Sequence, residues 1–489
     1  MSPARKRTKI IATLGPASDH DDTLRAMIDA GLNVVRINFS HARHDALRAS
    51  IARVRRVSEA AGVPVAILGD LRGPRIRVGE VAGGAILLAA GSDILLTPTP
   101  CVGTPERVGV TFPLLAGDVE PGALLLLDDG NLLLSVREVR GGADGDILAH
   151  VTRGGMLSSN RGLNLPGRRV NLPSLTDKDV ADVDFAVAEG FDFLALSFVQ
   201  SVEDVHGLQR LLAAHGSDIP VVAKIEKKSA LDDIEAIAVA ANGVMVARGD
   251  LALEMSLPEV PVAQKRIIAV CRQAACPVIT ATQMLESMTH APKPTRAEAT
   301  DVANAIFDGT DAVMLSGESA TGEFPAETVA TMSAIAARAE AAWHDGELPP
   351  PPPLVETREP ESIVAHAAKD IATALGARAI ITHTTSGSTT RRVACHRPNM
   401  ALLALCPDER VCRRLALTWG VESERTEEIR GTAHMVRLAL GAAAARVGAQ
   451  PGEHVVIVAG TPYRVSGRTN LIKVETVPSA DGQPAPHAS

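Results

Sequence analysis

Residues 221–250 read VVAKIEKKSALDDIEAIAVAANGVMVARGD, and an apolar run stands at each end of this stretch. Val221–Glu226 and Gly243–Asp250 both begin with apolar residues and end in charged ones. Continuous apolar runs of this length are typical of strands that are buried on both faces of a parallel sheet. The stretch therefore predicts two parallel strands, each with charged residues at its carboxyl end.

Six further runs of the same kind occur along the chain. They are Thr8–Gly15, Asn33–Ser40, Val65–Leu71, Phe193–Val199, Pro277–Met284 and Ala312–Ser319. Helical patterns separate most of the eight runs. Thr295 and Glu298 form a capping box for a helix that Gly309 ends, and Thr176 opens a helix that Gly190 ends, with Val180, Val183 and Val187 on one face. Eight strands with intervening helices predict an α/β protein built on a (β/α)8 TIM barrel.

About a hundred residues of different texture separate the third run from the fourth. They are rich in Gly and in short Leu/Val alternations, such as Ala123–Leu127 and Asn131–Val136, with a turn at Asp128–Gly130 between them. We predict a small inserted β-barrel domain at residues 73–171. The catalytic barrel then comprises residues 1–72 and 172–345. An insertion in a βα loop lies over the barrel mouth, so it is expected to act as a lid.

The barrel pattern ends before a run of five prolines, Pro349–Pro353, which is typical of an extended linker. The remainder predicts a third, C-terminal α/β domain at residues 346–489, to which the family resemblance described below assigns a regulatory role. Its expected elements are a helix at Ala365–Leu375 and strands at Arg378–Thr384, Glu453–Ala459 and Leu471–Val477.

Composition narrows the class of protein. Aromatic residues make up 2% of the chain and the net charge is −8, which argues against a nucleic-acid partner. No run approaches the ~18 apolar residues of a membrane span, and the N-terminus lacks a signal-peptide pattern. The six cysteines form no CxxC pair. Scattered free thiols fit a reducing compartment, so we expect a cytoplasmic protein without membrane contact.

Polar residues close or follow six of the eight runs. They are Arg36, Asn38, Ser40, Asp70, Arg72, Arg77, Lys224, Glu226, Arg248, Asp250, Thr282, Gln283, Ser316 and Glu318. In a (β/α)8 barrel these strand ends converge on one mouth. Glu226 and Asp250 are hard oxygen ligands that suit Mg2+ or Mn2+, and Arg36, Arg77 and Lys224 suit phosphate. The combination favours phosphoryl transfer. Because no Gly-x-x-x-x-Gly-Lys-Ser/Thr motif is present, side chains and metal must hold the phosphates.

In order along the chain, these motifs resemble those of the pyruvate kinase family. The matching segments are Thr8–Ser18, Asn33–His41, Ala223–Glu226, Val246–Leu251, Ala281–Met288, Pro294–Glu298 and Met314–Glu318, with Asp128–Gly130 and Gly162–Gly167 in the insert. The resemblance covers roughly residues 8–477. It implies transfer of the phosphoryl group of phosphoenolpyruvate to ADP, which gives pyruvate and ATP in the last step of glycolysis.

The resemblance also implies residue roles. Glu226 and Asp250 would hold the divalent ion, and Lys224 would stabilise the phosphoryl group. Arg36 and Arg77 would clamp phosphates. The substrate carboxylate would meet the backbone around Gly249 and Asp250 together with Thr282, which would also help to protonate the enolate. Nucleotide contacts would come from Arg36, Asn38, His41, Arg77 and Arg161, and a second Mg2+ would arrive with ADP. The sequence departs from the family at Ala252, usually Gly, and at Lys227, where Asn is common.

Asn38, Ser40, Asp70 and the Leu71 carbonyl match the family's monovalent-cation pocket. Members that require potassium carry Glu in the segment Gly-Pro-x-Ile-Arg, whereas potassium-independent members carry Lys. Arg75 stands at that position here. We therefore expect an enzyme that does not require K+. The alternative is that Arg75 points into solvent and leaves the pocket unchanged.

The segment Thr384–Thr389 resembles the family's loop for an allosteric phosphorylated effector, with Thr384, Ser386, Gly387, Ser388 and Thr389 as candidate ligands. The later loop Gly460–Gly467 lacks the Trp of enzymes that fructose 1,6-bisphosphate activates, which favours AMP or a sugar monophosphate. The family also implies a homotetramer. Two other classes share some of these features: a metal-dependent aldolase or lyase acting on pyruvate, and a non-catalytic sensor.

Overall fold

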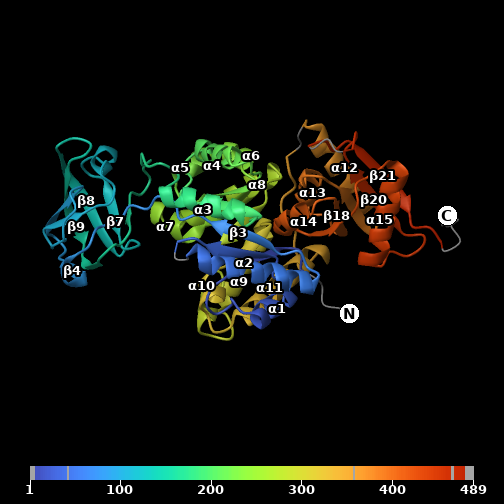
Figure 1. Cartoon of the computed structure of the whole chain (residues 1–489), viewed down its shortest axis with the longest axis horizontal. Coiled ribbons are helices and arrows are strands. Elements are labelled where there is room, and N and C mark those ends of the chain that lie inside the picture. Colours follow the sequence, from blue (N-terminus) through green and yellow to red (C-terminus); the bar gives the residue numbers. More distant parts are fainter. Residues whose placement is uncertain (1–5, 41–42, 356–357, 464–466, 480–489) are drawn as a thin grey trace.

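The computed structural model describes residues 6–40, 43–355, 358–463 and 467–479. Eight parallel strands close into a barrel at the centre of the molecule, in the order β1-β16-β15-β14-β13-β12-β3-β2 (Figure 1). Their bounds are β1 Lys9–Thr13, β2 Val34–Asn38, β3 Ala66–Asp70, β12 Phe193–Leu196, β13 Val221–Ile225, β14 Gly243–Ala247, β15 Val278–Ala281 and β16 Ala312–Leu315. Each lies within one of the eight predicted runs, so the predicted (β/α)8 barrel is confirmed.

Helices connect and surround these strands. Eight of these helices are α1 Asp21–Asp29, α2 His44–Ala61, α3 Asp177–Ala188, α4 Val202–Ala214, α6 Ile234–Ala240, α8 Glu259–Gln273, α9 Arg296–Asp308 and α11 Pro325–His344. Thr176 and Thr295 both form the capping boxes that the sequence predicts, and Gly309 ends α9 with a φ of 95°. Val180 differs from the prediction: it is 36% exposed, because it lies outside the face of α3 that packs on the barrel.

Three short helices interrupt the expected pattern at the barrel mouth: α5 Ser229–Asp232, α7 Arg248–Glu254 and α10 Gly317–Ala320. The run Gly243–Asp250 was expected to be strand throughout, yet β14 ends at Ala247. The Gly249 N–H donates to Thr282 Oγ1 at 2.9 Å instead of pairing with a strand. Asp250 therefore lies in the first turn of a helix.

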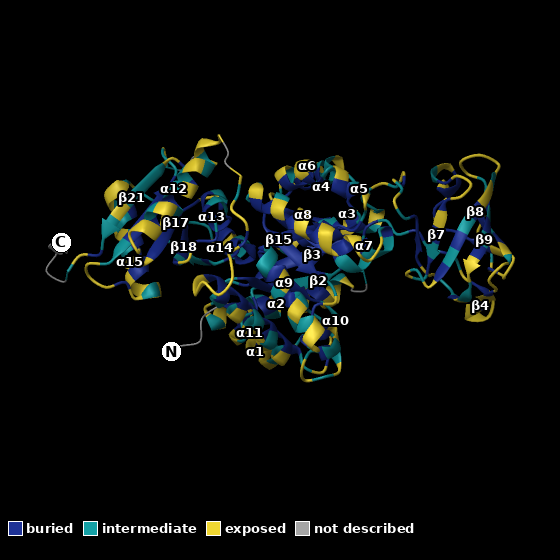
Figure 2. Ribbon diagram, turned by 180° about the vertical axis from the view of Figure 1, so that it is seen from behind, coloured by how far each residue is buried: buried dark blue, intermediate teal, exposed yellow. Residues whose placement is uncertain are grey.

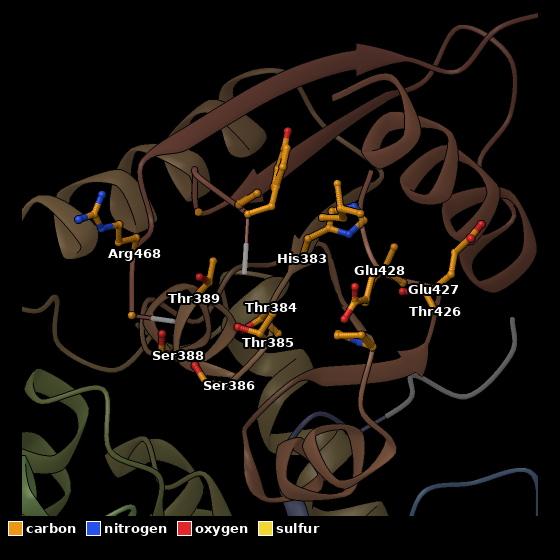
Figure 3. Close-up of a pocket in the computed structure, with 17 residues that line it drawn as sticks. His383, Thr384, Thr385, Ser386, Ser388, Thr389, Thr426, Glu427, Glu428 and Arg468 are labelled. Carbon is orange, nitrogen blue, oxygen red and sulfur yellow. The ribbon is translucent and has the colours of Figure 1, made fainter. Parts of the chain in front are cut away.

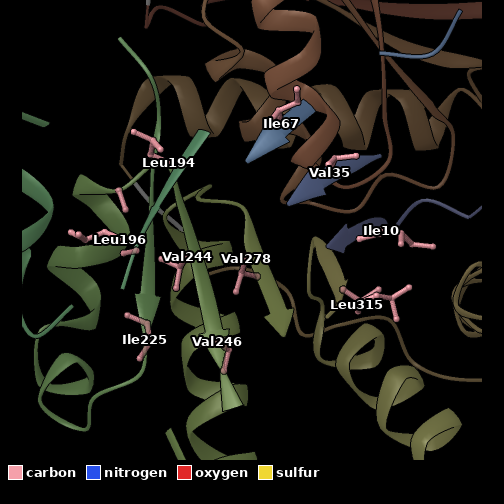
Figure 4. Close-up of a cluster of buried hydrophobic side chains, with 14 of the residues drawn as sticks. Ile10, Val35, Ile67, Leu194, Leu196, Ile225, Val244, Val246, Val278 and Leu315 are labelled. Atoms are coloured by element: carbon pink, nitrogen blue, oxygen red, sulfur yellow. The ribbon is translucent and has the colours of Figure 1, made fainter. Parts of the chain in front are cut away.

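Side chains alternate between two apolar layers of the barrel. One set packs against the surrounding helices, as Figure 4 shows for Ile10, Val35, Ile67, Leu194, Leu196, Ile225, Val244, Val246, Val278 and Leu315. The other set, which includes Ile11, Leu68 and Met245, fills the barrel interior. Figure 2 shows the resulting buried centre and the exposed outer faces of the helices.

The insert lies at one end of the molecule, opposite the C-terminal domain (Figure 1). It contains a six-stranded sheet, β11-β7-β8-β9-β5-β6, and a two-stranded sheet, β10-β4, which share one apolar core. The strands are β4 Ala85–Leu88, β5 Asp93–Thr97, β6 Arg107–Gly109, β7 Leu124–Leu127, β8 Leu132–Arg140, β9 Asp146–Arg153, β10 Gly155–Ser158 and β11 Leu163–Asn164. The predicted turn at Asp128–Gly130 joins β7 to β8.

The C-terminal domain is a five-stranded sheet with the order β19-β18-β17-β20-β21. Its strands are β17 Ala379–His383, β18 Ala401–Cys406, β19 Val421–Arg425, β20 His454–Ala459 and the antiparallel edge strand β21 Leu471–Thr476. Its helices are α12 Pro360–Ala374, α13 Ser388–Ala394, α14 Glu409–Arg414 and α15 Thr432–Val447. The three predicted strands and the predicted helix are present, and β18 and β19 were not predicted.

This domain closes the amino-terminal end of the barrel. Ala416 and Leu417, which follow α14, belong to the same buried cluster as the interior side chains of the barrel. Ion pairs flank this contact, from Arg397 to Asp311 at 3.0 Å and from Arg413 to Asp192 at 2.8 Å. In the part of the chain that the structure describes, no helix is long and apolar enough to cross a membrane.

Candidate active site

The carboxyl ends of the barrel strands surround a cleft of about 540 Å³. Its lining contains most of the candidates from the sequence, and they come from separate strands and from the insert. They are Arg36, Asn38, Ser40, Asp70, Leu71, Arg72, Arg75, Arg77, Lys224, Glu226 and Asp250, joined by Asn160, Ser197 and Phe198. The predicted convergence of the strand ends thus brings these residues together.

Lys224, in β13, lies at the centre of the cleft. Its Nζ contacts Glu226 Oε1 at 2.9 Å and Asp70 Oδ1 at 3.2 Å, and donates to Ser197 Oγ at 2.8 Å. Burial disfavours the charged amine, but the charges of Asp70 and Glu226 outweigh burial and raise the pKa of Lys224 above its ordinary value. The cleft therefore holds a fixed positive charge.

Asp70, at the end of β3, is the shared partner of two cations. Its Oδ2 accepts from Arg36 Nε at 2.7 Å, while Arg36 also donates to Thr13 Oγ1 at 3.0 Å. Burial alone would raise the pKa of the Asp70 carboxyl, but Lys224 and Arg36 together lower it. Asp70 is thus an ionised residue that orients Arg36 and Lys224 towards the cleft.

Glu226 and Asp250 are the two carboxylates that suit a divalent cation. Glu226 is 2% exposed, and its Oε2 accepts from the Phe198 N–H at 2.7 Å. Burial and the charge of Asp250 raise the pKa of Glu226 in spite of Lys224. A divalent cation between two such carboxylates would relieve this repulsion, so the donor set fits Mg2+ or Mn2+. The described residues include no cluster of three or more Asp, Glu, His or Cys side chains suited to a metal.

Thr282 and Gly249 lie beside this cleft rather than among its lining residues. Thr282 Oγ1 donates to the Ala281 carbonyl at 2.7 Å while it accepts from the Gly249 N–H. Thr282 has a φ of 70°, an uncommon conformation for a β-branched residue. Arg248 holds this turn, because it donates to the carbonyls of Ala281 and Thr282 and pairs with Asp301 at 2.7 Å.

Two arginines of the insert, Arg75 and Arg77, line the cleft. Arg77 Nη1 donates to the Asn160 carbonyl at 2.8 Å, and Arg75 pairs with Asp129 at 2.7 Å. Burial and the charges of Arg75 and Arg72 lower the pKa of Arg77. Arg161 is outside the lining of the cleft and lies 3.2 Å from Asp128. The last nucleotide candidate, His41, lies outside the described residues.

The predicted monovalent-cation residues also share the cleft. Asn38 Oδ1 accepts from the Ser40 N–H at 2.9 Å, and the Leu71 carbonyl accepts from Ser197 Oγ at 2.7 Å. Ser197 and Phe198 were missed by the sequence analysis, although the run Phe193–Val199 contains both. They follow β12, and Phe198 has a φ of 55°, which turns its N–H towards Glu226.

Four of the five candidate effector residues, all but Gly387, line a second pocket, in the C-terminal domain (Figure 3). Thr384 Oγ1 accepts from the Gly387 N–H at 2.8 Å, and the hydroxyls of Thr389 and Thr469 lie 2.7 Å apart. Figure 3 shows the loop hydroxyls between Arg468 on one side and Glu427 and Glu428 on the other. The Ser386 and Ser388 side chains also line this pocket.

Comparison with known proteins identifies a single family. Residues 5–329 match the family model of the pyruvate kinase barrel domain, and residues 362–475 match that of the pyruvate kinase alpha/beta domain. The chain is 45% identical over 478 residues to the pyruvate kinase of Geobacillus stearothermophilus, covering 97% of this chain and 81% of the relative. It is 42% identical over 476 residues to that of Mycobacterium tuberculosis (strain ATCC 25618 / H37Rv), covering 97% and 99%.

A solved structure is similar over nearly the whole length. The crystal structure of a pyruvate kinase from Cryptosporidium parvum matches with a TM-score of 0.89 and 35% sequence identity, covering 97% of each chain. The barrel, the insert and the C-terminal domain are thus all within the range of the match. Together with the two family models, these similarities show that the chain belongs to the pyruvate kinase family.

Proposed function

We propose that the cleft around Lys224 is where this enzyme transfers the phosphoryl group of phosphoenolpyruvate to ADP, the last step of glycolysis. The observation that carries the proposal is the buried network of Arg36, Asp70, Lys224 and Glu226. It holds two positively charged side chains, Arg36 and Lys224, and the Glu226 carboxylate proposed to bind metal in fixed positions before substrate arrives. Charge that is preorganised in this way stabilises a transition state without reorganisation at the moment of reaction.

Arg36 and Lys224 meet the transferring phosphoryl group in this proposal, and Arg77 meets the phosphates of the nucleotide. Lys224 supplies a compact charge whose position is set by three contacts, whereas the guanidinium groups can hold phosphate oxygens in pairs. Asn38, Arg161 and His41 complete the nucleotide contacts, and a second Mg2+ enters with ADP.

Glu226 and Asp250 would hold the divalent cation, Mg2+ or Mn2+. When bound there, the cation neutralises charge that develops on substrate oxygens. The chain's own share of this work is to keep the two carboxylates apart and oriented. The Phe198 N–H fixes Glu226, and the first turn of α7 fixes Asp250.

Thr282 and the backbone at Gly249 and Asp250 bind the substrate carboxylate in this proposal. The Gly249 N–H donates to Thr282 Oγ1, so a carboxylate that binds this amide takes the place of the hydroxyl. The released Thr282 hydroxyl can then take part, through water, in protonating the enolate of pyruvate. The constrained backbone at Thr282 supports this role, since such conformations cluster at active sites.

The enzyme does not require K+ in our proposal. Arg75 lines the same cleft as Asn38, Ser40 and Asp70, so its charge can replace that of a bound monovalent ion. Two unit charges ~4 Å apart at an effective dielectric of ~20 interact by roughly 4 kcal/mol, which is enough to keep K+ out of a weak site. The Asp129 carboxylate, 2.7 Å from Arg75, ties this charge to the insert.

The pocket of Figure 3 is the proposed effector site. Its hydroxyls and Arg468 suit one phosphate group. The carboxylates of Glu427 and Glu428 on the other side suit hydroxyl or amino donors rather than a second phosphate, which favours a sugar monophosphate or AMP. We further propose a homotetramer that acts in the cytoplasm. The free cysteines support this compartment.

One assay tests the function. The purified enzyme with phosphoenolpyruvate, ADP and Mg2+ should form pyruvate and ATP in equal amounts, and no pyruvate without ADP. Pyruvate formed from phosphoenolpyruvate without ADP would indicate hydrolysis, with water as the phosphoryl acceptor. A lyase or aldolase would form no pyruvate from phosphoenolpyruvate, with or without ADP. Absence of turnover with intact effector binding would indicate a sensor.

A further inference from the structure

Glu254 joins three parts of the molecule at one buried carboxylate. It is the last residue of α7, the helix that carries Asp250 in its first turn, and its side chain is 2% exposed. Its Oε1 accepts from Lys227 Nζ at 2.5 Å, and its Oε2 accepts from the Gly167 N–H at 3.2 Å. Lys227 directly follows Glu226, and Gly167 belongs to the segment that returns from the insert to the barrel.

A second contact also links the insert to α7. Gly130, in the turn between β7 and β8, lies against Leu253, since a Cβ at Gly130 would be 3.5 Å from Leu253 Cδ2. The helix therefore meets the insert at two places, through adjacent residues. Another contact joins the insert to the barrel without involving α7. The Gln200 side chain accepts from the Val170 N–H and donates to the Val170 carbonyl, both at 3.0 Å.

The Lys227–Glu254 pair joins the end of α7 to the residue that follows Glu226. Both side chains are nearly buried, with 12% and 2% exposure. Removal of one member of such a pair leaves an uncompensated charge in a poorly solvated place. Because Lys227 directly follows Glu226 and Glu254 shares α7 with Asp250, the pair links the two segments that carry the carboxylates proposed to bind the divalent cation.

We propose that Lys227 and Glu254 are positioning residues that couple the insert to the divalent-cation site. The inference rests on the proposed roles of Glu226 and Asp250. Movement of the insert at Gly167 changes the hydrogen bond to Glu254, and through α7 it changes the place of Asp250. Such coupling is reciprocal, so a cation bound at Glu226 and Asp250 also restrains Gly167.

The test follows both ends of this link without a catalytic assay. Amide hydrogen exchange at Gly167 reports on the insert, and the affinity for Mn2+, from electron paramagnetic resonance of the free ion, reports on the cation site. In Lys227→Met and in Glu254→Leu we expect Gly167 to exchange about tenfold faster and Mn2+ to bind about tenfold more weakly. Lys227→Arg, which keeps the charge, should restore most of both.

Two control variants match these changes. Lys228→Met removes a neighbouring lysine that is 49% exposed, and it should alter neither measurement. Gln200→Leu frees the insert at Val170 but leaves α7 alone, so it should not change the affinity for Mn2+. In the parent protein, saturation with Mn2+ should slow exchange at Gly167. This measurement uses the unmodified protein, so it does not depend on whether any variant folds.

Unchanged exchange at Gly167 in Lys227→Met and Glu254→Leu would overturn the proposed tether. Faster exchange at Gly167 with unchanged affinity for Mn2+ would overturn the coupling. So would a parent protein in which saturation with Mn2+ leaves the exchange rate at Gly167 unchanged. A parent that forms no pyruvate would refute the proposed function, yet it would leave these two comparisons decisive for the inference.

Discussion

Replacing Lys224 by methionine separates its part in catalysis from its part in stability. The change keeps the length of the side chain and removes its charge and its contacts with Asp70, Glu226 and Ser197, at 3.2, 2.9 and 2.8 Å. A single preorganised group at a transition state contributes about 3–4 kcal/mol, so we expect kcat to fall about a hundred- to a thousandfold. The KM for phosphoenolpyruvate should change much less, because Arg36 stays in place through Asp70.

The same variant should also show a pH-dependent loss of stability. Asp70 keeps Arg36, but Glu226 loses its lysine partner in a buried place, which costs about 3–5 kcal/mol when the carboxylate stays ionised. The pKa of Glu226 is already raised in the parent, and without Lys224 it rises further. A carboxyl with a raised pKa in the folded state binds more protons folded than unfolded. The deficit in Tm should therefore grow as the pH rises above 4.5, the ordinary value for glutamate.

Pyruvate formation, coupled to oxidation of NADH by lactate dehydrogenase, measures kcat and KM, and thermal melts across the pH range measure the deficit. Lys228→Met is the matched control, since this lysine is 49% exposed. A Lys224→Met enzyme that kept its kcat and lost affinity would refute the reasoning, because Lys224 would then serve binding alone. A deficit in Tm that shrank with rising pH would contradict the proposed pairing with Glu226.

Three further outcomes are expected. Asp250→Ala and Glu226→Ala should each abolish turnover at ordinary Mg2+ while circular dichroism stays native, because each removes one of the two carboxylates proposed to bind the divalent cation; near-normal turnover would exclude the metal assignment. With tetramethylammonium as the only added monovalent cation the parent should be fully active, and Arg75→Glu should acquire a K+ requirement; strong activation of the parent by K+ would contradict charge replacement. A sugar monophosphate or AMP should lower the phosphoenolpyruvate concentration for half-maximal rate. Ser388→Ala should weaken the affinity for this activator about tenfold to a hundredfold, since a charge-assisted hydrogen bond contributes about 1.5–3 kcal/mol; a saturation curve that none of these ligands shifts would remove the effector proposal.

The barrel could be predicted because its signals are local and repeated. Each run is apolar on both faces and ends in polar residues. The capping boxes that begin at Thr176 and Thr295 each involve a second residue three positions later, so a short local motif identifies where each helix begins. The convergence of Arg36, Lys224 and Asp250 then follows from barrel geometry alone, without knowledge of any contact. The position of a residue could therefore be predicted from the sequence wherever it depends only on the strand that carries the residue.

Other parts of the site depend on neighbours that no local pattern reveals. Nothing in the local sequence distinguishes the Ser197 hydroxyl from that of any other serine. Its place in the site depends on Lys224 of the neighbouring strand, whose Nζ donates to it at 2.8 Å. Phe198 contributes a backbone N–H, which every residue but proline has, and only its φ of 55° directs it to Glu226. The helical start of α7 was missed for a related reason. The apolar run continues to Ala247, and the strand is interrupted by a hydrogen bond to Thr282, which follows β15.

The position of Leu417 inside the end of the barrel has a consequence for how the protein is made. About 70 residues separate the end of α11 at His344 from the segment that begins at Leu415. At ~5–20 residues per second, a ribosome needs roughly 4–14 s to make them. During that interval a nascent barrel with all eight strands still exposes the interior apolar side chains that Ala416 and Leu417 later cover. The growing chain thus passes through a stage in which it is prone to aggregation and can be bound by chaperones. This stage ends only when the C-terminal domain has been made and has packed on the barrel.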